Sequence, residues 1–356
     1  MILRLKLDEL NNGINGNYGT IYNIFSGDIP YQGEISYDLY LYIDGSVTSE
    51  TMGQTFSAGI AVKSYEREPD PTSLALDISL GNIIIYEGST ENTLYVSGGG
   101  LAEQIEIDNT LPIVITGTTE EYGIEVYGGT SNITLNNVGI KSSHIGEDGV
   151  NSGPIRLEND AMVNLNIEGE NSINAIENNG ISRCSVGIYV PSASTLIIGG
   201  NGTINVISNF GTGIGTNYMG YTVGTIIINS GIINATSTTG GAAIGGYDFN
   251  LIEINGGNVT TISNGIGASI GGTGGVTGDI GNYITGEIII NNGNVTAISN
   301  GSGAGIGGGG NDRVMCYQTT APNIYISDIA NVTAIAGENN GDIPPENIGN
   351  SSGCVG

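Results

Sequence analysis

The chain has 356 residues but no tryptophan, one histidine, three cysteines and only eight lysines and arginines. The lone His144 and the scattered cysteines offer no metal-ligand spacing, so the metal ligands stay unknown. Three sparse cysteines are not a disulfide framework, and we expect plain thiols. No apolar run approaches the roughly 18 residues of a spanning helix, which argues against membrane insertion. The first ten residues mix acidic and basic side chains without an apolar core, so no signal peptide is predicted.

Basic residues are few, whereas acidic residues are plentiful. The chain has 35 aspartates and glutamates and a net charge of −27. This charge argues against nucleic acid and anionic membranes as partners. Some of the carboxylates can bind Ca²⁺, but there is no dense D-x-D-x-D run and no nonapeptide calcium repeat. We therefore expect no cofactor, with Ca²⁺ as the one ion left open.

Five short segments with one layout recur near the C-terminus. Their central isoleucines lie 30, 26, 36 and 37 residues apart, and the last segment has lost its second glycine. A period of this size indicates stacked structural units, with an atypical terminal unit. The segments are Gly213-Ile214-Gly215, Ala243-Ile244-Gly245, Ser269-Ile270-Gly271, Gly305-Ile306-Gly307 and Asp342-Ile343-Pro344.

Two further columns of β-branched residues follow each of these segments. The step from the second column to the third is 7 or 8 residues, and the step to the next isoleucine of the first column is 11 each time. Only the step from first to second column varies, between 8 and 18 residues. Three short strands and three corners in as few as 26 residues predict an all-β solenoid coil. The second column is centred on Ile226, Ile252, Ile288 and Ile324, and the third on Ile233, Val259, Val295 and Val332.

Similar segments extend the pattern towards the N-terminus and predict eight to ten coils. We expect a small N-terminal β cap or attachment module over residues 1–50, the solenoid over 51–335 and an irregular tail over 336–356. First-column candidates are Ile188-Tyr189-Val190, Ile155-Arg156-Leu157, Ile124-Glu125-Val126, Leu94-Tyr95-Val96 and Ile60-Ala61-Val62. Second-column candidates are Leu196, Val163-Asn164-Leu165, Ile133-Thr134-Leu135 and Ile113-Val114-Ile115.

The repeat resembles a known family. Residues 287–308 read EIIINNGNVTAISNGSGAGIGG, which is similar to the repeats of right-handed, pectate-lyase-like parallel β-helix proteins of Gram-positive bacteria and their phages, some of them carbohydrate-binding. The resemblance covers residues 200–335. It implies a right-handed single-stranded parallel β-helix with three strands per coil. Because this fold carries many functions, it fixes no chemistry.

The variable connection between the first and second columns is the candidate site. Stacked coils bring these loops to one side of the rod, and each loop carries an aromatic residue. Aromatic rings with carboxylates nearby suit sugar rings and their hydroxyls. Loop packing and an oligomer interface are the alternatives. The predicted ligand-binding residues are Tyr218, Tyr221, Tyr247, Asp248, Phe249, Asp279, Tyr283, Asp312 and Tyr317.

The sequence favours a binding protein over an enzyme but also offers candidate catalytic residues. Asp248, Asp279 and Asp312 come from successive coils, so neighbouring pairs can approach the separation of glycosidase carboxylates. Arg313 is the only basic residue in these loops. However, glycine-rich loops have few side chains that could exclude water from the pocket of a catalytic acid. An uncharged or basic polysaccharide suits the acidic surroundings better than a polyuronate.

The sequence therefore predicts a non-enzymatic β-helix, on an extracellular surface or a virion, that binds polysaccharide or cell-surface glycan or mediates adhesion. The alternatives are a phage tail-spike or fibre that degrades polysaccharide by hydrolysis or elimination, and a purely structural fibre or decoration protein. A homotrimer, or docking through the N-terminal segment, is compatible with these functions. The tripeptide Asn-Val-Thr at Asn258, Asn294 and Asn331 matches a glycosylation acceptor, but we interpret it as part of the coil.

Overall fold

The chain divides into two units, Met1–Pro71 and Thr72–Gly356. The computed structural model describes residues 2–8, 19–26, 59–63, 72–142, 153–175, 185–209, 211–216, 222–274, 285–310, 321–338 and 344–351. In the first unit, β1 (Ile2–Asp8) pairs antiparallel with β2 (Gly19–Ser26) and with β3 (Gly59–Lys63). Strand β3 contains Ile60-Ala61-Val62, so the prediction of a β-helix strand there is wrong. The boundary lies after Pro71, not at residue 50, because β3 completes the first sheet.

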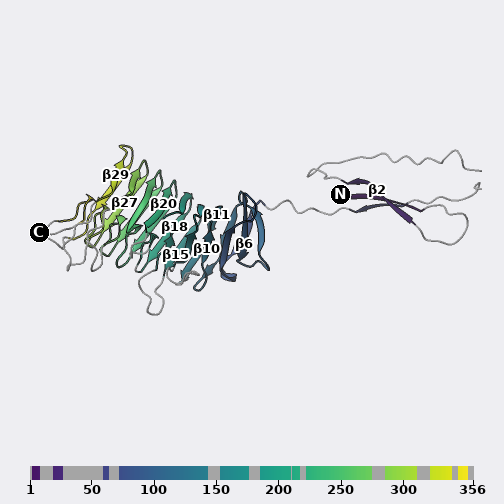
Figure 1. Cartoon of the computed structure of the whole chain (residues 1–356), viewed down its shortest axis with the longest axis horizontal. Helices are drawn as coiled ribbons and strands as arrows, with labels where there is room; N and C mark the ends of the chain where they lie inside the picture. Colours follow the sequence, from purple (N-terminus) through teal and green to yellow (C-terminus); the bar gives the residue numbers. More distant parts are fainter. Residues whose placement is uncertain are drawn as a thin grey trace, which may run out of the picture. The chain divides into compact units, whose positions relative to one another are not determined.

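The second unit is a right-handed parallel β-helix. Its described residues form three sheets, and strands of successive coils lie side by side (Figure 1). In spatial order, the first sheet contains β31 (Ile348–Gly349), β28 (Ile306–Gly307), β25 (Ile270–Gly272), β22 (Ile244–Gly246), β19 (Ile214–Gly215), β16 (Ile188–Tyr189), β13 (Ile155–Glu158), β10 (Ile124–Tyr127), β5 (Ile83–Glu87), β6 (Thr93–Gly98) and β7 (Ile105–Asp108).

The other two sheets complete each coil. The second sheet contains β29 (Asn323–Ile326), β26 (Glu287–Ile290), β23 (Asp248–Ile254), β20 (Thr222–Ile228), β17 (Thr195–Gly200), β14 (Met162–Glu168), β11 (Thr130–Asn136), β8 (Ile113–Thr116) and β4 (Leu74–Asp77). The third sheet contains β30 (Asn331–Ile335), β27 (Asn294–Ser299), β24 (Asn258–Ser263), β21 (Ile232–Ser237), β18 (Thr203–Ser208), β15 (Glu170–Ala175), β12 (Gly139–Ser142) and β9 (Thr118–Thr119).

The described residues contain one short 3-10 helix, η2 (Ile78–Leu80). None of their helices has the length and apolar character needed to cross a membrane.

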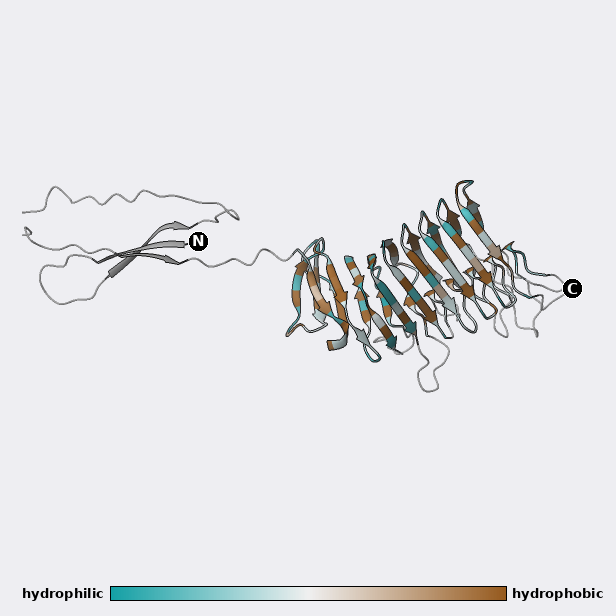
Figure 2. Cartoon of the chain, turned by 180° about the vertical axis from the view of Figure 1, so that it is seen from behind, coloured by the Kyte–Doolittle hydropathy of each residue, from teal (hydrophilic) through white to brown (hydrophobic). Residues whose placement is uncertain are grey.

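The three predicted columns are the three sheets. Ile214 pairs with Ile244, Ile226 with Ile252, and Ile233 with Val259 in the predicted register. The earlier first-column strands at residues 124, 155 and 188 are confirmed in the same way. Alternate side chains point inwards and build ladders of buried isoleucine, valine and leucine. Figure 2 shows this alternation of hydrophobic and hydrophilic residues along the strands.

The N-terminal end of the first sheet differs from the prediction. Leu94-Tyr95-Val96 lies in β6, which pairs antiparallel with β5, and it is Ile83 of β5 that pairs in parallel with Ile124. The connection between β5 and β6 is too short for a parallel crossover, so a hairpin forms. Strand β7 pairs antiparallel with β6 and ends the sheet. Its alternating Glu106 and Asp108 discourage further edge pairing.

The last coil also corrects the prediction. Ile306 pairs with Ile348 and Gly307 with Gly349, so the terminal repeat keeps its glycine. The predicted Ile343 lies outside the described residues. It precedes Pro344-Pro345, which lack the N–H groups that a ladder needs, and the strand forms after them. The step from the third column to the first is therefore longer in this coil than the usual 11 residues.

Buried hydrogen bonds explain why the connection from third to first sheet has constant length. The hydroxyls of Ser208, Ser237, Ser263 and Ser299 donate to the carbonyls of Ser185, Gly211, Gly241 and Gly267, at 2.5–3.3 Å. In the next corner the glycines after the first-column isoleucines stack with φ between 127° and 145°. A Cβ on Gly215, Gly245, Gly271 or Gly307 would lie 1.8–2.2 Å from the carbonyl oxygen of the next glycine. In these later coils only glycine fits this corner.

The Asn-Val-Thr asparagines also stack. The Asn294 side chain donates to that of Asn258 at 2.8 Å, and Asn331 donates to Asn294 at 3.1 Å. These hydrogen bonds join the second-to-third-sheet corners of successive coils and support the structural interpretation of the tripeptide.

Candidate functional site

Most of the predicted loop site lies outside the described residues. This applies to the ligand-binding candidates Tyr218, Tyr221, Asp279, Tyr283, Asp312 and Tyr317 and to Arg313. Tyr247, Asp248 and Phe249 are described: Tyr247 immediately precedes β23, and Asp248 and Phe249 are its first two residues.

Phe249 belongs to the core and not to a binding surface. Strand β23 begins at Asp248, in register with Thr222 of β20, so Phe249 pairs with Val223 and points inwards. Its side chain is only 1% exposed. The prediction that its ring contacts a ligand is therefore corrected, because the strand starts earlier than the isoleucine pattern indicates.

The Asp248 side chain forms hydrogen bonds to a corner of the following coil. Its Oδ1 accepts hydrogen bonds from the amides of Phe249 (2.9 Å) and Thr285 (2.8 Å), and its Oδ2 accepts one from the Thr285 hydroxyl (2.8 Å). Tyr247 is half-buried and also interacts with other residues. At these positions the observed contacts are those of loop packing, one of the alternatives raised by the sequence.

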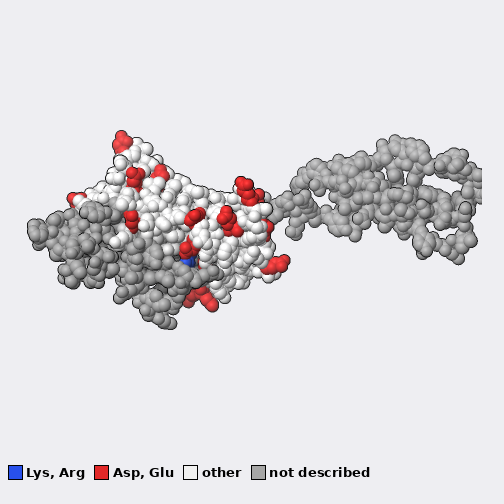
Figure 3. All heavy atoms as spheres, in the orientation of Figure 1, with Lys and Arg blue, Asp and Glu red and all other residues white. Residues whose placement is uncertain are grey.

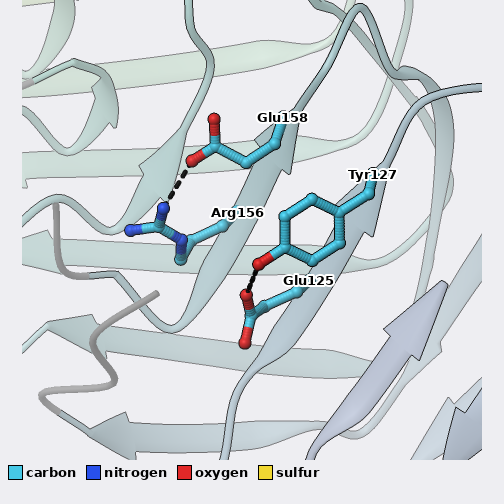
Figure 4. Close-up of polar contacts among 4 residues, drawn as sticks. All are labelled: Glu125, Tyr127, Arg156 and Glu158. Atoms are coloured by element: carbon cyan, nitrogen blue, oxygen red, sulfur yellow. Dashed lines mark hydrogen bonds and ion pairs between the residues drawn. The ribbon is translucent and has the colours of Figure 1, made fainter. Parts of the chain in front are cut away.

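A second group of polar residues lies on the outer face of the first sheet. Glu125 and Tyr127 extend from β10, and Arg156 and Glu158 from β13 (Figure 4). Their neighbours Ile124, Val126, Ile155 and Leu157 are in the core, so strand alternation directs these polar side chains outwards. We call Glu125, Tyr127, Arg156, Glu158 and Tyr189 of β16 the polar cluster.

Three members of the polar cluster are buried although they lie on the outer face. Arg156 is 1% exposed, Tyr189 3% and Glu125 4%. The Arg156 guanidinium donates to the Glu158 carboxylate and lies over the Tyr189 ring, 5.3 Å from its centroid. The Tyr127 hydroxyl donates to Glu125. The Glu158 carboxylate is thus paired with the Arg156 guanidinium, which also makes a cation–π contact with Tyr189, and the Glu125 carboxylate accepts a hydrogen bond from a phenol.

Tyrosines continue this surface towards the N-terminal end. Tyr95, Tyr86 and Tyr127 lie opposite one another on β6, β5 and β10, with Glu106 beyond Tyr95 and Glu158 beyond Tyr127. Neighbouring strands are about 4.8 Å apart. The rings of Tyr86 and Tyr127 stack with centroids 5.0 Å apart and 14° between planes. All three tyrosines are half-buried. We call Tyr95, Tyr86 and Tyr127 the tyrosine row.

The tyrosine row, with Glu106 and Glu158 at its ends, offers a rigid surface of rings, hydroxyls and carboxylates, and the buried members of the polar cluster lie beside it. Such groups recognise polyhydroxyl compounds, because rings contact C–H bonds and carboxylates accept hydroxyl hydrogens. Figure 3 shows acidic groups spread over the visible face of the β-helix, with little basic surface. In the described part of the chain, no three histidine, cysteine, aspartate or glutamate side chains come together as a metal site.

The sequence pattern identifies β10 and β13 as strands but does not predict this surface. One signal was available. In the later coils the outward position of the first column is glycine, as at Gly215, which pairs with Tyr189. The same position holds Tyr189, Arg156 and Glu125 in the earlier coils. Large polar side chains where the repeat otherwise has glycine mark a surface that the fold alone does not require.

No family model, curated protein or solved structure matches the chain. The parallel β-helix is therefore known from its strand pairing, and a function must be argued from the side chains that this fold places on its surface.

Proposed function

We propose that this protein is a non-enzymatic β-helix that binds polysaccharide, displayed on a cell surface or a virion as in the Gram-positive and phage proteins that its repeat resembles. The observation that carries the proposal is the tyrosine row with a glutamate at each end, in register across five adjacent strands. The tyrosine row has the chemistry predicted for the loop site, namely aromatic rings beside carboxylates along the β-helix. However, it lies on the first sheet and not in the loops between the first and second sheets.

The β-helix holds this surface rigidly. The tyrosines stand on strands whose opposite faces are packed in the core, so little conformational entropy is lost when a ligand binds. A polymer lying along the rod can contact successive rings, and many weak contacts then add up. The −27 charge of the chain favours a neutral or basic polymer over a polyuronate.

Paired substitution of Tyr86 and Tyr95 by alanine tests the proposal. These two rings are preferable to Tyr127, whose hydroxyl is bonded to the buried Glu125. Affinity electrophoresis against neutral, basic and acidic polysaccharides should show binding weakened about tenfold or more, the equivalent of at least ~1.4 kcal/mol. Tyr325→Ala, at a ring 55% exposed in the last coil, is the control and should bind as the unmodified protein does.

The predicted loop site can be compared in the same assay. A Tyr247/Tyr283/Tyr317 triple alanine variant removes loop rings and leaves the tyrosine row intact. If only this variant loses binding, polysaccharide binding stands but belongs to the loops. If no polysaccharide in the panel binds to the unmodified protein, the proposed function is wrong.

Polysaccharide cleavage is the second candidate, favoured by one observation. Glu125 is in register with Arg156, and Glu158 lies two residues further along β13, so the two glutamates occupy diagonal positions on adjacent strands, with Cα atoms about 7–8 Å apart. Cleavage would also require a substrate to reach Glu125, which is 4% exposed. Glycosidase carboxylates are separated by about 5–9 Å. Release of reducing ends or double bonds from the panel, abolished in Glu125→Gln and Glu158→Gln, would establish an enzyme. No release would leave the binding function.

A further inference from the structure

The second sheet carries a groove on its outer face, whereas the tyrosine row lies on the first sheet. The groove has a volume of about 390 Å³ and crosses β11, β14 and β17. None of its ten lining residues is charged, although the chain as a whole has a net charge of −27. They are Pro112, Asn132, Ile133, Thr134, Asn164, Leu165, Asn166, Ile197, Gly199 and Asn229.

A missing side chain creates the hollow. Thr134, Asn166 and Gly199 are in register on three successive strands, so Gly199 interrupts a row of outward side chains. A Cβ at Gly199 would meet only the Ser230 hydroxyl, at 3.7 Å. Gly199 is also not among the glycines with positive φ. Neither backbone conformation nor crowding requires glycine here, and its effect is to leave space.

A ladder of asparagine side chains reaches the groove, and its last member has an oxygen that can accept a further hydrogen bond. The Asn132 amide donates to the Asn109 carbonyl at 2.9 Å, and the Asn164 amide donates to Asn132 Oδ1 at 3.0 Å. The next position is Ile197, so within the described residues the ladder ends with Asn164 Oδ1 as an acceptor.

The Asn229 side chain, which also lines the groove, provides a hydrogen-bond donor that complements the Asn164 acceptor. Asn229 Oδ1 accepts from Asn255 at 3.0 Å, which leaves the Asn229 amide nitrogen as a donor. The groove therefore combines an acceptor, a donor and the apolar surfaces of Ile197 and Pro112. An alcohol hydroxyl both donates and accepts, so the arrangement matches a ligand with hydroxyls around an apolar C–H face.

We propose that this groove binds one neutral saccharide unit of the polysaccharide. The proposal rests on the proposed function and adds a second contact surface and the ligand class. A uronate or phosphate would meet no cation in the lining and would be repelled by the acidic protein. An amino sugar cation would meet no lining carboxylate. An uncharged pyranose can use Ile197 through its C–H bonds and Asn164 and Asn229 through its hydroxyls.

Gly199→Phe in the full chain tests the proposal, because the new ring fills the groove. The site has room and an ordinary φ, so the variant should fold, as circular dichroism and thermal unfolding would verify. Dextran, mannan and xylan serve as neutral probes, and polygalacturonate as the acidic one. We expect Gly199→Phe to weaken binding of a neutral polymer at least tenfold. The control Ile289→Phe lies on the outer face of the same sheet, between the core residues Ile288 and Ile290, and should bind normally.

The outcomes separate the two proposals. If the unmodified protein binds none of the polymers, the proposed function fails, and the groove proposal fails with it. If it binds a neutral polymer and Gly199→Phe binds equally well, only the groove proposal is overturned. Binding of polygalacturonate alone would overturn the neutral class while leaving polysaccharide binding in place.

Discussion

At the scale of single residues, glycine decides how the later coils stack. From Ile214 onwards, the glycine after the first-column isoleucine has a φ that side chains rarely adopt, and it lies against the backbone of the next coil. Both features recur wherever these later coils meet at this corner, whereas Glu125, Arg156 and Tyr189 occupy the position in earlier coils. The contrast with Gly199, which has space and no such φ, shows that glycines of one sequence have different physical roles.

Gly245→Ala should strongly destabilise the β-helix. The added Cβ would lie 1.9 Å from the Gly271 carbonyl oxygen at a φ of 136°, and strained backbone alone costs on the order of 1–3 kcal/mol. We expect a loss of about 3 kcal/mol or more in the free energy of unfolding, measured in urea. Gly199→Ala is the matched control, with an expected change within about 0.5 kcal/mol. Equal effects of the two substitutions would contradict this account of the corner.

At the scale of strands and corners, most of the pairing follows from the periodic pattern. The strands of residues 214–335 have the predicted register because inward isoleucine and valine recur at fixed steps. The variable corner behaves differently. There Asp248 uses its carboxylate to hold the next coil, and the strand starts early enough to bury Phe249. The Asp248 side chain therefore holds Thr285, at the end of the connection between β25 and β26, against the preceding coil.

Asp248→Ala should loosen this corner. The variant loses hydrogen bonds to the Phe249 amide, the Thr285 amide and the Thr285 hydroxyl, with an expected cost of about 2 kcal/mol. Hydrogen exchange should show faster exchange of the Thr285 amide. Glu253→Ala is the charge-matched control on the same strand and should leave Thr285 protected. Lost glycan binding with Thr285 still protected would instead support the predicted ligand role of Asp248.

At the scale of the whole β-helix, stability is spread along the stack. Each coil contacts mainly its neighbours, as in other solenoids, so stability is close to a sum over coils and interfaces. The antiparallel β6 and β7 close the first sheet. The last coil instead exposes apolar residues, including Ile326 (37%) and Ile348 (43%), that correspond to buried ones in earlier coils.

Removal of one complete coil should be tolerated. Deletion of residues 244–269 joins Ala243 to Ile270, which already occupies the position in register with Ile244. The shortened chain should keep its far-ultraviolet circular dichroism and a cooperative thermal transition. Deletion of residues 244–256 is the control, because it removes two strands of a coil and leaves the third out of place. Retained folding in both deletions would contradict the coil as the structural unit.

The sequence by itself determined the repeat, the three sheets and the register of the later coils, because inward β-branched residues and corner glycines must recur with the coil. Only the tertiary structure decided the rest. Leu94 pairs antiparallel because a hairpin is shorter than a coil, and Ile348 replaces Ile343 because prolines interrupt the strand. Glu125 lies beside Arg156, and Asn164 lines one groove with Gly199, through strand stacking across insertions of unequal length. A periodic pattern specifies which side chains point inwards, but outward neighbours come from different coils and depend on the pairing itself.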